Sequence, residues 1–380
     1  MIDFLRNLIR PKYWPLNEIQ IIKKNILDNL SYLQSLQPTA DIFPVLKSNA
    51  YGHGLKELCK ILNESQVKAV IVDSFPEAQI VYKNFKRKVI ILNEMPLAAY
   101  KYCHLDRSEF CLYNQKSIEY LAKNHPGANI HLFTNTGMNR EGITNFSRFI
   151  EENKSHLDKL NVVGLCSHLA SADSYSDLNK KQSDNFLAAL EVLNKHNFYP
   201  KFVHLGNSAG IFTINNPKFT AYRAGIALYG YNIFSPDHSA YLAASKLKPA
   251  LRLLSTISAA QKIKSGDYVS YNETFCADQA TTVAVIPIGY YEGLDRRLSN
   301  LAQFKVLAQK SFMAQVAGKI CMNLTCLNCQ GNEFNIGDRV EIISLDNKQA
   351  NSLINLAVIE KTIPYEILTR LQSNIHREII

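Results

Sequence analysis

The stretch VLKSNAYGHG, Val45–Gly54, decides how the rest of the chain is interpreted. The apolar run Ile42–Leu46 predicts a buried strand that delivers Lys47 to a loop with two glycines. Desolvation at the end of such a strand favours the neutral amine that carbonyl chemistry requires. The alternative is an ordinary solvated lysine at the start of a loop. We therefore ask whether the other residues agree with a reactive Lys47.

Length and composition favour a globular enzyme of two domains. The chain has 380 residues, of which 47% are hydrophobic and 20% charged, and this length exceeds one typical domain. No apolar run approaches the roughly 20 residues of a membrane helix. The N-terminal residues lack the apolar core and the cleavage site of a signal peptide. We therefore expect a cytoplasmic enzyme that does not bind a membrane.

Charge and cysteine content exclude further classes. The net charge of +9 is spread along the chain, without the basic stripe or known module that nucleic-acid binding needs. Eight cysteines in a chain this long do not suggest a disulfide scaffold. Cys321, Cys326 and Cys329 lie close in sequence, but no nearby His or Cys supplies the fourth ligand of a zinc site. We expect no metal and no nucleic acid, and a small molecule as the substrate.

The first two thirds of the chain alternate between strand and helix patterns. A helix is predicted at residues 17–36, with Asn17 as its N-cap. Eight strand signals follow, separated by helical stretches, at residues 42–46, 68–73, 88–92, 110–113, 129–133, 162–167, 202–205 and 222–229. Such alternation indicates parallel strands with helical crossovers, and eight units suit an α/β protein with a (β/α)8 TIM-like barrel. A doubly wound sheet is the alternative, but the G-x-G-x-x-G turn after its first strand is missing.

The pattern changes after about residue 245. Short β-like runs at residues 250–260, 281–286 and 339–343 are separated by Gly-Asp turns, and a helical segment lies near residues 351–372. We expect an N-terminal barrel at residues 1–245 and a mostly β C-terminal domain at residues 246–380. In a barrel, the chemically suggestive residues that follow the strands meet at one mouth.

The segment Gly206–Gly210, GNSAG, supports two interpretations. As G-x-S-x-G after a strand it matches the nucleophile elbow of a serine hydrolase, with Ser208 as the nucleophile. The serine hydrolase fold needs an acidic residue and then a histidine further along the chain. The sequence offers no well-supported candidate for either residue. Alternatively, Asn207, Ser208 and neighbouring N–H groups surround a phosphate, because barrels commonly bind phosphate after strands seven and eight. Gly225 follows the eighth strand, where glycine permits a close approach, and we favour the phosphate interpretation.

Several segments together resemble one family. The Lys47 motif is followed, in order, by TGMNREG, HLASAD, HLGNS, RAGIALYG, VSYNETF, GY and CMN, at residues 136–142, 168–173, 204–208, 223–230, 269–275, 289–290 and 321–323. These resemble the motifs of the pyridoxal-phosphate-dependent alanine racemases of fold type III. Their order matches that of the family, and they span nearly the whole chain. The resemblance implies a barrel followed by a β domain, and interconversion of L- and D-alanine, with D-alanine supplied for peptidoglycan synthesis.

The resemblance also implies roles for residues of the barrel. Lys47 would form the Schiff base with pyridoxal 5'-phosphate and act as one of two acid/base groups. Arg223 would donate to the pyridine nitrogen and leave it unprotonated, with His168 beside it. Arg140 would bind near the substrate carboxylate. The remaining cofactor-binding residues implied by the family are Tyr51, Asn207, Ser208, Gly225 and Ile226.

The second acid/base group implied by the resemblance is Tyr271, on the opposite face of the substrate from Lys47. A tyrosine is a weak base at neutral pH unless nearby cations favour the phenolate. The family supplies this tyrosine from the partner subunit, which implies a homodimer. Tyr290 and Met322 would line the entrance and the carboxylate site.

Three positions depart from the family pattern. Phe133 stands where the family often has a carbamylated lysine, and Asn135 replaces an acidic residue, so we expect Asn135 or an anion to orient Arg140. Asn323 replaces the aspartate of C-M-D. The alternatives left open are a broader amino-acid racemase acting on serine or basic amino acids, a non-catalytic pyridoxal-phosphate-binding protein, and a serine hydrolase using Ser208.

Overall fold

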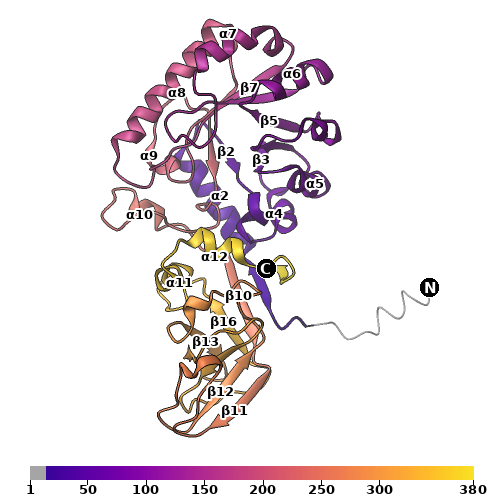
Figure 1. Ribbon diagram of the computed structural model, residues 1–380. Helices are drawn as coiled ribbons and strands as arrows, with labels where there is room; N and C mark the ends of the chain where they lie inside the picture. Colours follow the sequence, from indigo (N-terminus) through magenta and orange to yellow (C-terminus); the bar gives the residue numbers. More distant parts are fainter. Residues whose placement is uncertain (1–13) are drawn as a thin grey trace, which may run out of the picture. The chain divides into compact units, whose positions relative to one another are not determined.

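The computed structural model describes residues 14–380, which form two compact units. One consists of Ile21–Ala250 with Ile379–Ile380, and the other of residues 14–20 with Leu251–Glu378. Figure 1 draws the first mostly in indigo to pink and the second mostly in orange to yellow. We call them the barrel unit and the β unit.

Eight parallel strands form the barrel unit. Six make one sheet in the order β3-β4-β5-β6-β7-β8, and β2 pairs with β9. A bridge between Val45 and Ile71 joins β2 to β3, and backbone hydrogen bonds such as Thr220 N–H to Val203 O join β9 to β8, which closes the ring. The strands are β2 (Asp41–Pro44), β3 (Ala69–Val72), β4 (Lys88–Ile91), β5 (Ser108–Leu112), β6 (Asn129–Phe133), β7 (Asn161–Cys166), β8 (Phe202–His204) and β9 (Ala221–Ala224). The predicted (β/α)8 barrel is confirmed.

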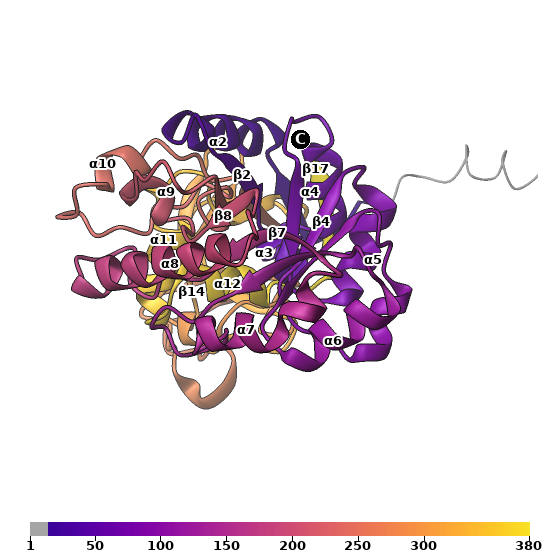
Figure 2. The same cartoon turned by 90° about the horizontal axis from the view of Figure 1, so that it is seen from above.

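Helices surround these strands on the outside (Figure 2). Asn114, Asn145 and Ser176 accept hydrogen bonds from N–H groups of the helices that they precede, which satisfies part of each N-terminus. The helices are α2 (Lys23–Leu36), α3 (Lys47–Tyr51), α4 (Leu55–Leu62), α5 (Phe75–Asn84), η1 (Leu97–Tyr102), α6 (Gln115–Asn124), α7 (Phe146–Leu157), α8 (Asp177–Lys195), α9 (Gly210–Thr213) and α10 (Tyr241–Ala244).

The β unit is built on a nine-stranded sheet in the order β11-β12-β15-β14-β13-β16-β10-β1-β17. A small apolar cluster of Val269, Val283 and Ala317 lies beside its β11–β12 end. The elements are β1 (Glu18–Ile21), β10 (Leu251–Thr256), β11 (Ala259–Ile263), η2 (Tyr271–Glu273), β12 (Thr281–Ile286), η3 (Arg296–Leu298), β13 (Gln303–Leu307), β14 (Phe312–Val316), β15 (Thr325–Asn328), β16 (Arg339–Ile343), α11 (Leu353–Glu360), α12 (Pro364–Arg370) and β17 (His376–Ile379).

Three sequence predictions of local structure were wrong. The predicted helix at residues 17–36 begins only at Lys23, because Glu18–Ile21 is a strand in the sheet that also contains β10. Asn17 therefore caps no helix, and its side chain instead donates to Pro287 O and accepts from Ser255. The run at residues 250–260 divides into β10 and β11. The helical segment at residues 351–372 divides into α11 and α12 at Lys361, which has a φ of 52°.

The domain boundary also differs from the expected position at residues 245 and 246. In the structure the chain passes from the barrel unit to the β unit after Ala250. Residues 14–20 also belong to the β unit. The reason is strand pairing, because β1 lies between β10 and β17.

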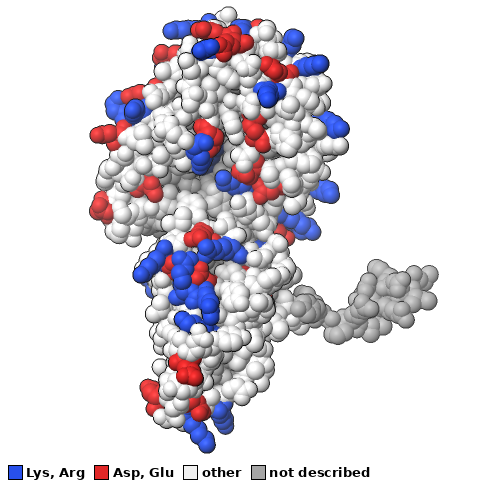
Figure 3. All heavy atoms as spheres, in the orientation of Figure 1, with Lys and Arg blue, Asp and Glu red and all other residues white. Residues whose placement is uncertain are grey.

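Charged side chains of both signs are interspersed on the face drawn in Figure 3. No helix among the described residues combines the length and apolar character needed to cross a membrane. Within residues 14–380, no group of three or more His, Cys, Asp or Glu side chains is arranged to hold a metal ion.

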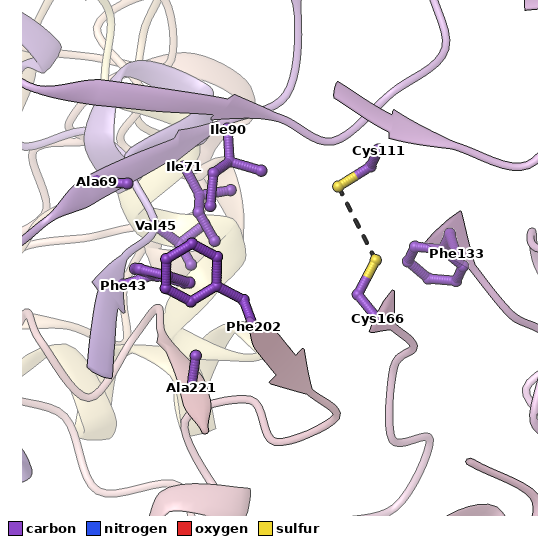
Figure 4. Close-up of a cluster of buried hydrophobic side chains, with 10 residues drawn as sticks. All are labelled: Phe43, Val45, Ala69, Ile71, Ile90, Cys111, Phe133, Cys166, Phe202 and Ala221. Atoms are coloured by element: carbon purple, nitrogen blue, oxygen red, sulfur yellow. Dashed lines mark hydrogen bonds between the residues drawn. The ribbon is translucent and has the colours of Figure 1, made fainter. Parts of the chain in front are cut away.

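The barrel interior is filled by one apolar cluster, which Figure 4 shows. It includes Phe43, Ile71, Ile90, Phe202 and the neighbouring thiols of Cys111 and Cys166, whose sulfur atoms lie 3.9 Å apart. Polar residues share this interior face. Because side chains alternate along a strand, Glu109, His131, His204 and Arg223 point inward two positions from Cys111, Phe133, Phe202 and Ala221.

Candidate active site

Lys47 begins a left-handed turn at the carboxyl end of β2. Ser48, Asn49, Ala50 and Tyr51 have φ values of 55°, 54°, 53° and 51°. Each such residue costs roughly 1–2 kcal/mol for an L-amino acid. The carboxylate of Glu77, at the start of α5, accepts from the N–H groups of Ser48 (2.6 Å) and Asn49 (3.4 Å). A strained segment held by a carboxylate contact is typical of a functional site.

The Lys47 side chain is 38% exposed, so it is only partly desolvated. Its Nζ lies 3.6 Å from a carboxylate oxygen of Asp73, which follows β3. The amine therefore points to the barrel mouth beside one acidic group.

A cradle of donors lies beside the Lys47 turn, after β8 and β9. Ser208 Oγ accepts from the N–H groups of Gly225 (3.0 Å) and Ala227 (3.2 Å). A Cβ atom at Gly225 would lie 2.6 Å from Tyr51 Oη, so any residue larger than glycine would displace the Tyr51 hydroxyl. Burial raises the pKa of Tyr51 to about 12, which keeps its hydroxyl protonated. No hydrogen bond among the described residues uses the N–H of Ile226. Hydroxyl and N–H donors packed this closely fit a phosphate group.

The nucleophile-elbow interpretation finds no support in the geometry. Among residues 14–380, the hydrogen bonds that Ser208 Oγ accepts come from backbone N–H groups and not from a histidine. His238, next to Asp237, stacks on Tyr175 and Phe234, and its Nδ1 accepts from Ala240 N–H. Asn207 turns its side-chain oxygen to the N–H of Gly210, which shapes the loop.

Arg223, on β9, lies at the centre of the mouth and is buried. Its two terminal nitrogens are fully engaged: Nη1 donates to His204 O (2.6 Å) and His204 Nδ1 (3.0 Å), and Nη2 to Ser167 O (2.6 Å), Leu205 O (3.1 Å) and His168 Nδ1 (3.2 Å). No hydrogen bond within the described residues uses its Nε–H. The guanidinium is therefore held in one plane with one donor remaining.

His168 is neutral at the mouth. Burial, and then the positive charges of Arg223, Arg140 and Lys47, lower its pKa to about 3. The Nη2–H of Arg223 donates to its Nδ1, so the ring proton lies on Nε2. His168 thus presents a neutral N–H group.

Arg140 follows β6 and forms a two-point ion pair with the carboxylate of its neighbour Glu141. Of the two expected partners of Arg140, Asn135 or an anion, the structure contradicts Asn135. The Asn135 side chain instead accepts from the N–H groups of Gly137 and Asn139 and so closes its own loop. Phe133 packs in the barrel interior, where its ring meets Tyr113.

The other three predicted site residues lie in the β unit, on loops that hydrogen-bond to one another. Tyr271 follows Ser270, whose hydroxyl donates to Lys319 O (2.5 Å), and the N–H of Tyr290 donates to Cys321 O (3.1 Å). Tyr271, Tyr290 and Met322 are 61%, 45% and 56% exposed. Asn323 donates to Glu292 (2.8 Å), which also accepts from Gly289 N–H (2.8 Å).

The structure therefore groups the predicted residues into two sets. Lys47, Tyr51, Arg140, His168, Asn207, Ser208, Arg223, Gly225 and Ile226 lie in the barrel unit, and Tyr271, Tyr290 and Met322 lie in the β unit. Sequence reasoning missed Asp73 and Glu77, which contact the Lys47 turn, and Glu141. Asp73 was detectable as an acid directly after a strand, whereas Glu77 lies inside a helix and gives no such signal.

Comparisons with known proteins agree with this arrangement. The family models for the alanine racemase N-terminal and C-terminal domains match residues 21–233 and 250–379. Alanine racemase of Leptospira interrogans serogroup Icterohaemorrhagiae serovar copenhageni is 30% identical over 378 residues, covering 95% of each chain.

Two solved structures illustrate the same similarity. Alanine racemase from Bacillus anthracis with bound L-Ala-P superposes with a TM-score of 0.87 at 25% identity, covering 97% of this chain and 96% of that one. The structure from Bartonella henselae with covalently bound pyridoxal phosphate has a TM-score of 0.84 at 24% identity, covering 96% and 99%. This chain, with both of its domains, belongs to the alanine racemase family.

Proposed function

We propose that the enzyme interconverts L-alanine and D-alanine with pyridoxal 5'-phosphate, using Lys47 and Tyr271 on opposite faces of the substrate. The observation that carries this proposal is the fixed guanidinium of Arg223 at the same mouth as Lys47. Four of its five N–H groups are used within the barrel, and a protonated fork is a donor to a ring nitrogen, not an acid.

The residues of the mouth fit this cofactor. When bound, pyridoxal phosphate supplies an aldehyde that an amine can capture and a ring that accepts electrons as a Cα–H bond breaks. Tyr51, Ser208 and the N–H groups near Gly225 and Ile226 would hold the phosphate, in a loop that Asn207 shapes. Lys47 would provide the amine, and Arg223 Nε–H would face the ring nitrogen.

Two protein groups would then share the two proton transfers of racemisation. Racemisation needs proton removal on one face of Cα and delivery on the other, and Lys47 Nζ would serve one face. Tyr271 would serve the other from the partner subunit of a homodimer, since its exposed loop is free to meet a second barrel. His168 and Arg223 would favour the phenolate through an N–H donor and a nearby positive charge.

Arg140 would bind the substrate carboxylate with its planar fork, while Tyr290 and Met322 would narrow the entrance. These side chains decide the substrate range. Because one methylene changes discrimination by only about 1–3 kcal/mol, activity on serine or a basic amino acid is the second candidate. In bacteria the D-alanine formed would feed peptidoglycan synthesis in the cytoplasm, and cell fractionation tests that location.

The decisive experiment incubates the purified protein, loaded with pyridoxal phosphate, separately with L-alanine and D-alanine. Chiral chromatography should show each enantiomer approaching the same equal mixture. Parallel incubations with serine and lysine measure the substrate range. Covalent cofactor without any racemisation would instead favour a non-catalytic binding protein, and ester hydrolysis lost in Ser208→Ala would favour the hydrolase.

A second experiment tests the shared site. Dimers of Lys47→Ala alone or of Tyr271→Phe alone should not racemise alanine, but a mixed dimer would contain one site with both native residues. Equal mixing with random exchange should restore roughly a quarter of the native activity, because half the dimers carry one working site. No recovery in dimers shown by mass spectrometry to be mixed would contradict the supply of Tyr271 by a partner.

A further inference from the structure

A continuous chain of buried polar groups runs from Arg223 into the barrel interior. Arg223 Nη1 lies 3.0 Å from His204 Nδ1, and His204 Nε2 lies 2.9 Å from His131 Nδ1. His131 Nε2 lies 2.8 Å from a carboxylate oxygen of Glu109. All four side chains are buried, with Glu109 and Arg223 each 5% exposed and both histidines fully enclosed. The chain therefore links two opposite charges through two imidazole rings.

The position of each proton follows from the two ends. Arginine is only a donor, so His204 Nδ1 must accept and its proton lies on Nε2. That Nε2–H donates to His131 Nδ1, which leaves the proton of His131 on Nε2, facing the acceptor Glu109. Burial and the charge of Arg223 lower the pKa of His204 well below its usual range, in agreement with a neutral ring. Every N–H in this series of hydrogen bonds, from Arg223 to Glu109, therefore points away from the mouth.

The surrounding barrel leaves space for this arrangement. A Cβ atom at Gly164, on β7, would lie 1.9 Å from His131 Nδ1, so the ring occupies the volume of the missing side chain. Phe202 stacks parallel to His131, with ring centroids 6.1 Å apart and an angle of 6°. Phe43 packs edge-on against His204. The rings are thus fixed by packing as well as by hydrogen bonds.

We propose that Glu109, with His131, is a positioning residue that orients the cofactor-facing Arg223 through an ordered chain of donors. The carboxylate fixes the tautomer of His131, which fixes that of His204 and keeps an acceptor facing Nη1. A reversed chain would bring an N–H of His204 against a guanidinium N–H, which repels. Glu109 also balances the buried charge of Arg223 across the barrel.

The role of the chain at the cofactor rests on the proposed function, but its proton order does not. The test therefore begins with the apoprotein. Imidazole 15N spectra of protein labelled at histidine should show His131 and His204 as neutral Nε2–H tautomers at neutral pH. Their signals are assigned with His131→Gln and His204→Gln variants. A doubly protonated ring or an Nδ1–H tautomer at either position would overturn the proposal.

Variants of Glu109 test the positioning role. Glu109→Gln keeps an acceptor oxygen and should retain both tautomers. Glu109→Leu removes the acceptor and should convert His131 or His204 to mixed tautomers. If the leucine variant does not fold, the native spectrum still decides the proton order. Unchanged tautomers in folded Glu109→Leu would contradict the proposal.

Cofactor affinity supplies the second readout, by fluorescence titration of the apoprotein with pyridoxal phosphate. Glu109→Leu should bind about tenfold more weakly, the lower end of what removing an outer partner of a ligand costs in metal sites. The matched control is Glu341→Leu in the β unit, where an equally buried carboxylate pairs with Arg252 at 2.6 Å. Equal weakening in both variants would mean a general loss of structure and would refute positioning.

Discussion

The barrel mouth and the exposed loops of the β unit use opposite means to hold reactive side chains. At the mouth, the buried Arg223 is fixed by several side-chain hydrogen bonds, one of which holds the ring of the half-buried His168. In the β unit, Tyr271 and Met322 are more than half exposed. Their loops are held by hydrogen bonds from the Ser270 hydroxyl to Lys319 O and from the Tyr291 N–H to Met322 O. The residues of the mouth contact one another within the barrel unit, whereas the side chains of Tyr271 and Met322 are exposed to solvent.

This difference indicates a division of labour. A cofactor needs a rigid surface whose donors are already oriented, because misplacement by about 1 Å costs large factors in rate. A residue supplied to another subunit must instead be exposed before assembly. We expect mouth substitutions to change cofactor binding, and substitutions in the β unit loops to change catalysis with the cofactor still bound.

The largest effect is expected for Lys47→Ala. Loss of the only amine proposed to capture the cofactor should abolish covalent attachment and racemisation together. Borohydride reduction followed by mass spectrometry measures the attachment. Lys68→Ala, which removes a surface pair with Asp41 (2.9 Å), is the control and should keep both properties. A covalent adduct at full yield in Lys47→Ala would contradict the assignment of Lys47 as the residue that binds the cofactor covalently.

Tyr271→Phe should leave the cofactor attached but slow one direction of proton transfer. Removing a general acid or base costs about 10²–10⁴-fold in rate. NMR in deuterated water should show Cα–H exchange of L-alanine falling much more than that of D-alanine. Tyr268→Phe, an exposed tyrosine of the same loop, should leave both rates unchanged. Equal losses for the two enantiomers would contradict the assignment of Tyr271 to one face.

Gly225→Ala tests the phosphate cradle. The added methyl would meet Tyr51 Oη at 2.6 Å, and Tyr51 cannot move freely because its ring packs on Tyr229 with centroids 5.0 Å apart. We expect pyridoxal phosphate to bind about tenfold more weakly, as when one ordered contact to a charged group is lost. Gly210→Ala on the same side has only ordinary contacts and serves as the control. If Gly225→Ala bound pyridoxal phosphate with native affinity, Gly225 would not be part of the phosphate site.

The barrel could be predicted from sequence because its signals are local. Each strand is a short apolar run ended by polar residues, as in Ala69–Val72 before Asp73. Strand β1 was missed because Glu18–Ile21 has apolar positions that also fit a helix, and its neighbour β10 is more than 200 residues away. Pairing over such a distance leaves no pattern in a local window.

The site was predictable to a similar extent. Residues that follow strands, such as Lys47 and Ser208, could be expected at one mouth from topology alone. The left-handed turn at Ser48–Tyr51 could not, since only Asn49 among these residues belongs to a type enriched at positive φ, and the contact with Glu77 is not visible in the local sequence. The Glu109–His131 contact was equally hidden, because it forms only when neighbouring strands bring alternating inward positions together.

The smallest expected effect concerns the pH dependence of stability. His168 has a folded-state pKa of about 3, below the value near 6.5 expected when unfolded. The unfolded chain therefore binds a proton between these pH values that the folded mouth does not, so stability falls as pH falls below about 6.5. At pH 5 this amounts to roughly 2 kcal/mol relative to neutral pH. Urea denaturation followed by circular dichroism measures it.

The variant that isolates this term is His168→Gln, which cannot titrate. Its loss of stability between pH 7.5 and 5 should be smaller than that of the native protein by the contribution of one histidine. Gln182→Met is the control, because Gln182 donates to the backbone oxygen of His168 (2.8 Å) without being titratable. It should lower stability equally at both pH values. Parallel behaviour of His168→Gln and native protein would mean that the neutral His168 does not contribute to the acid sensitivity of the mouth.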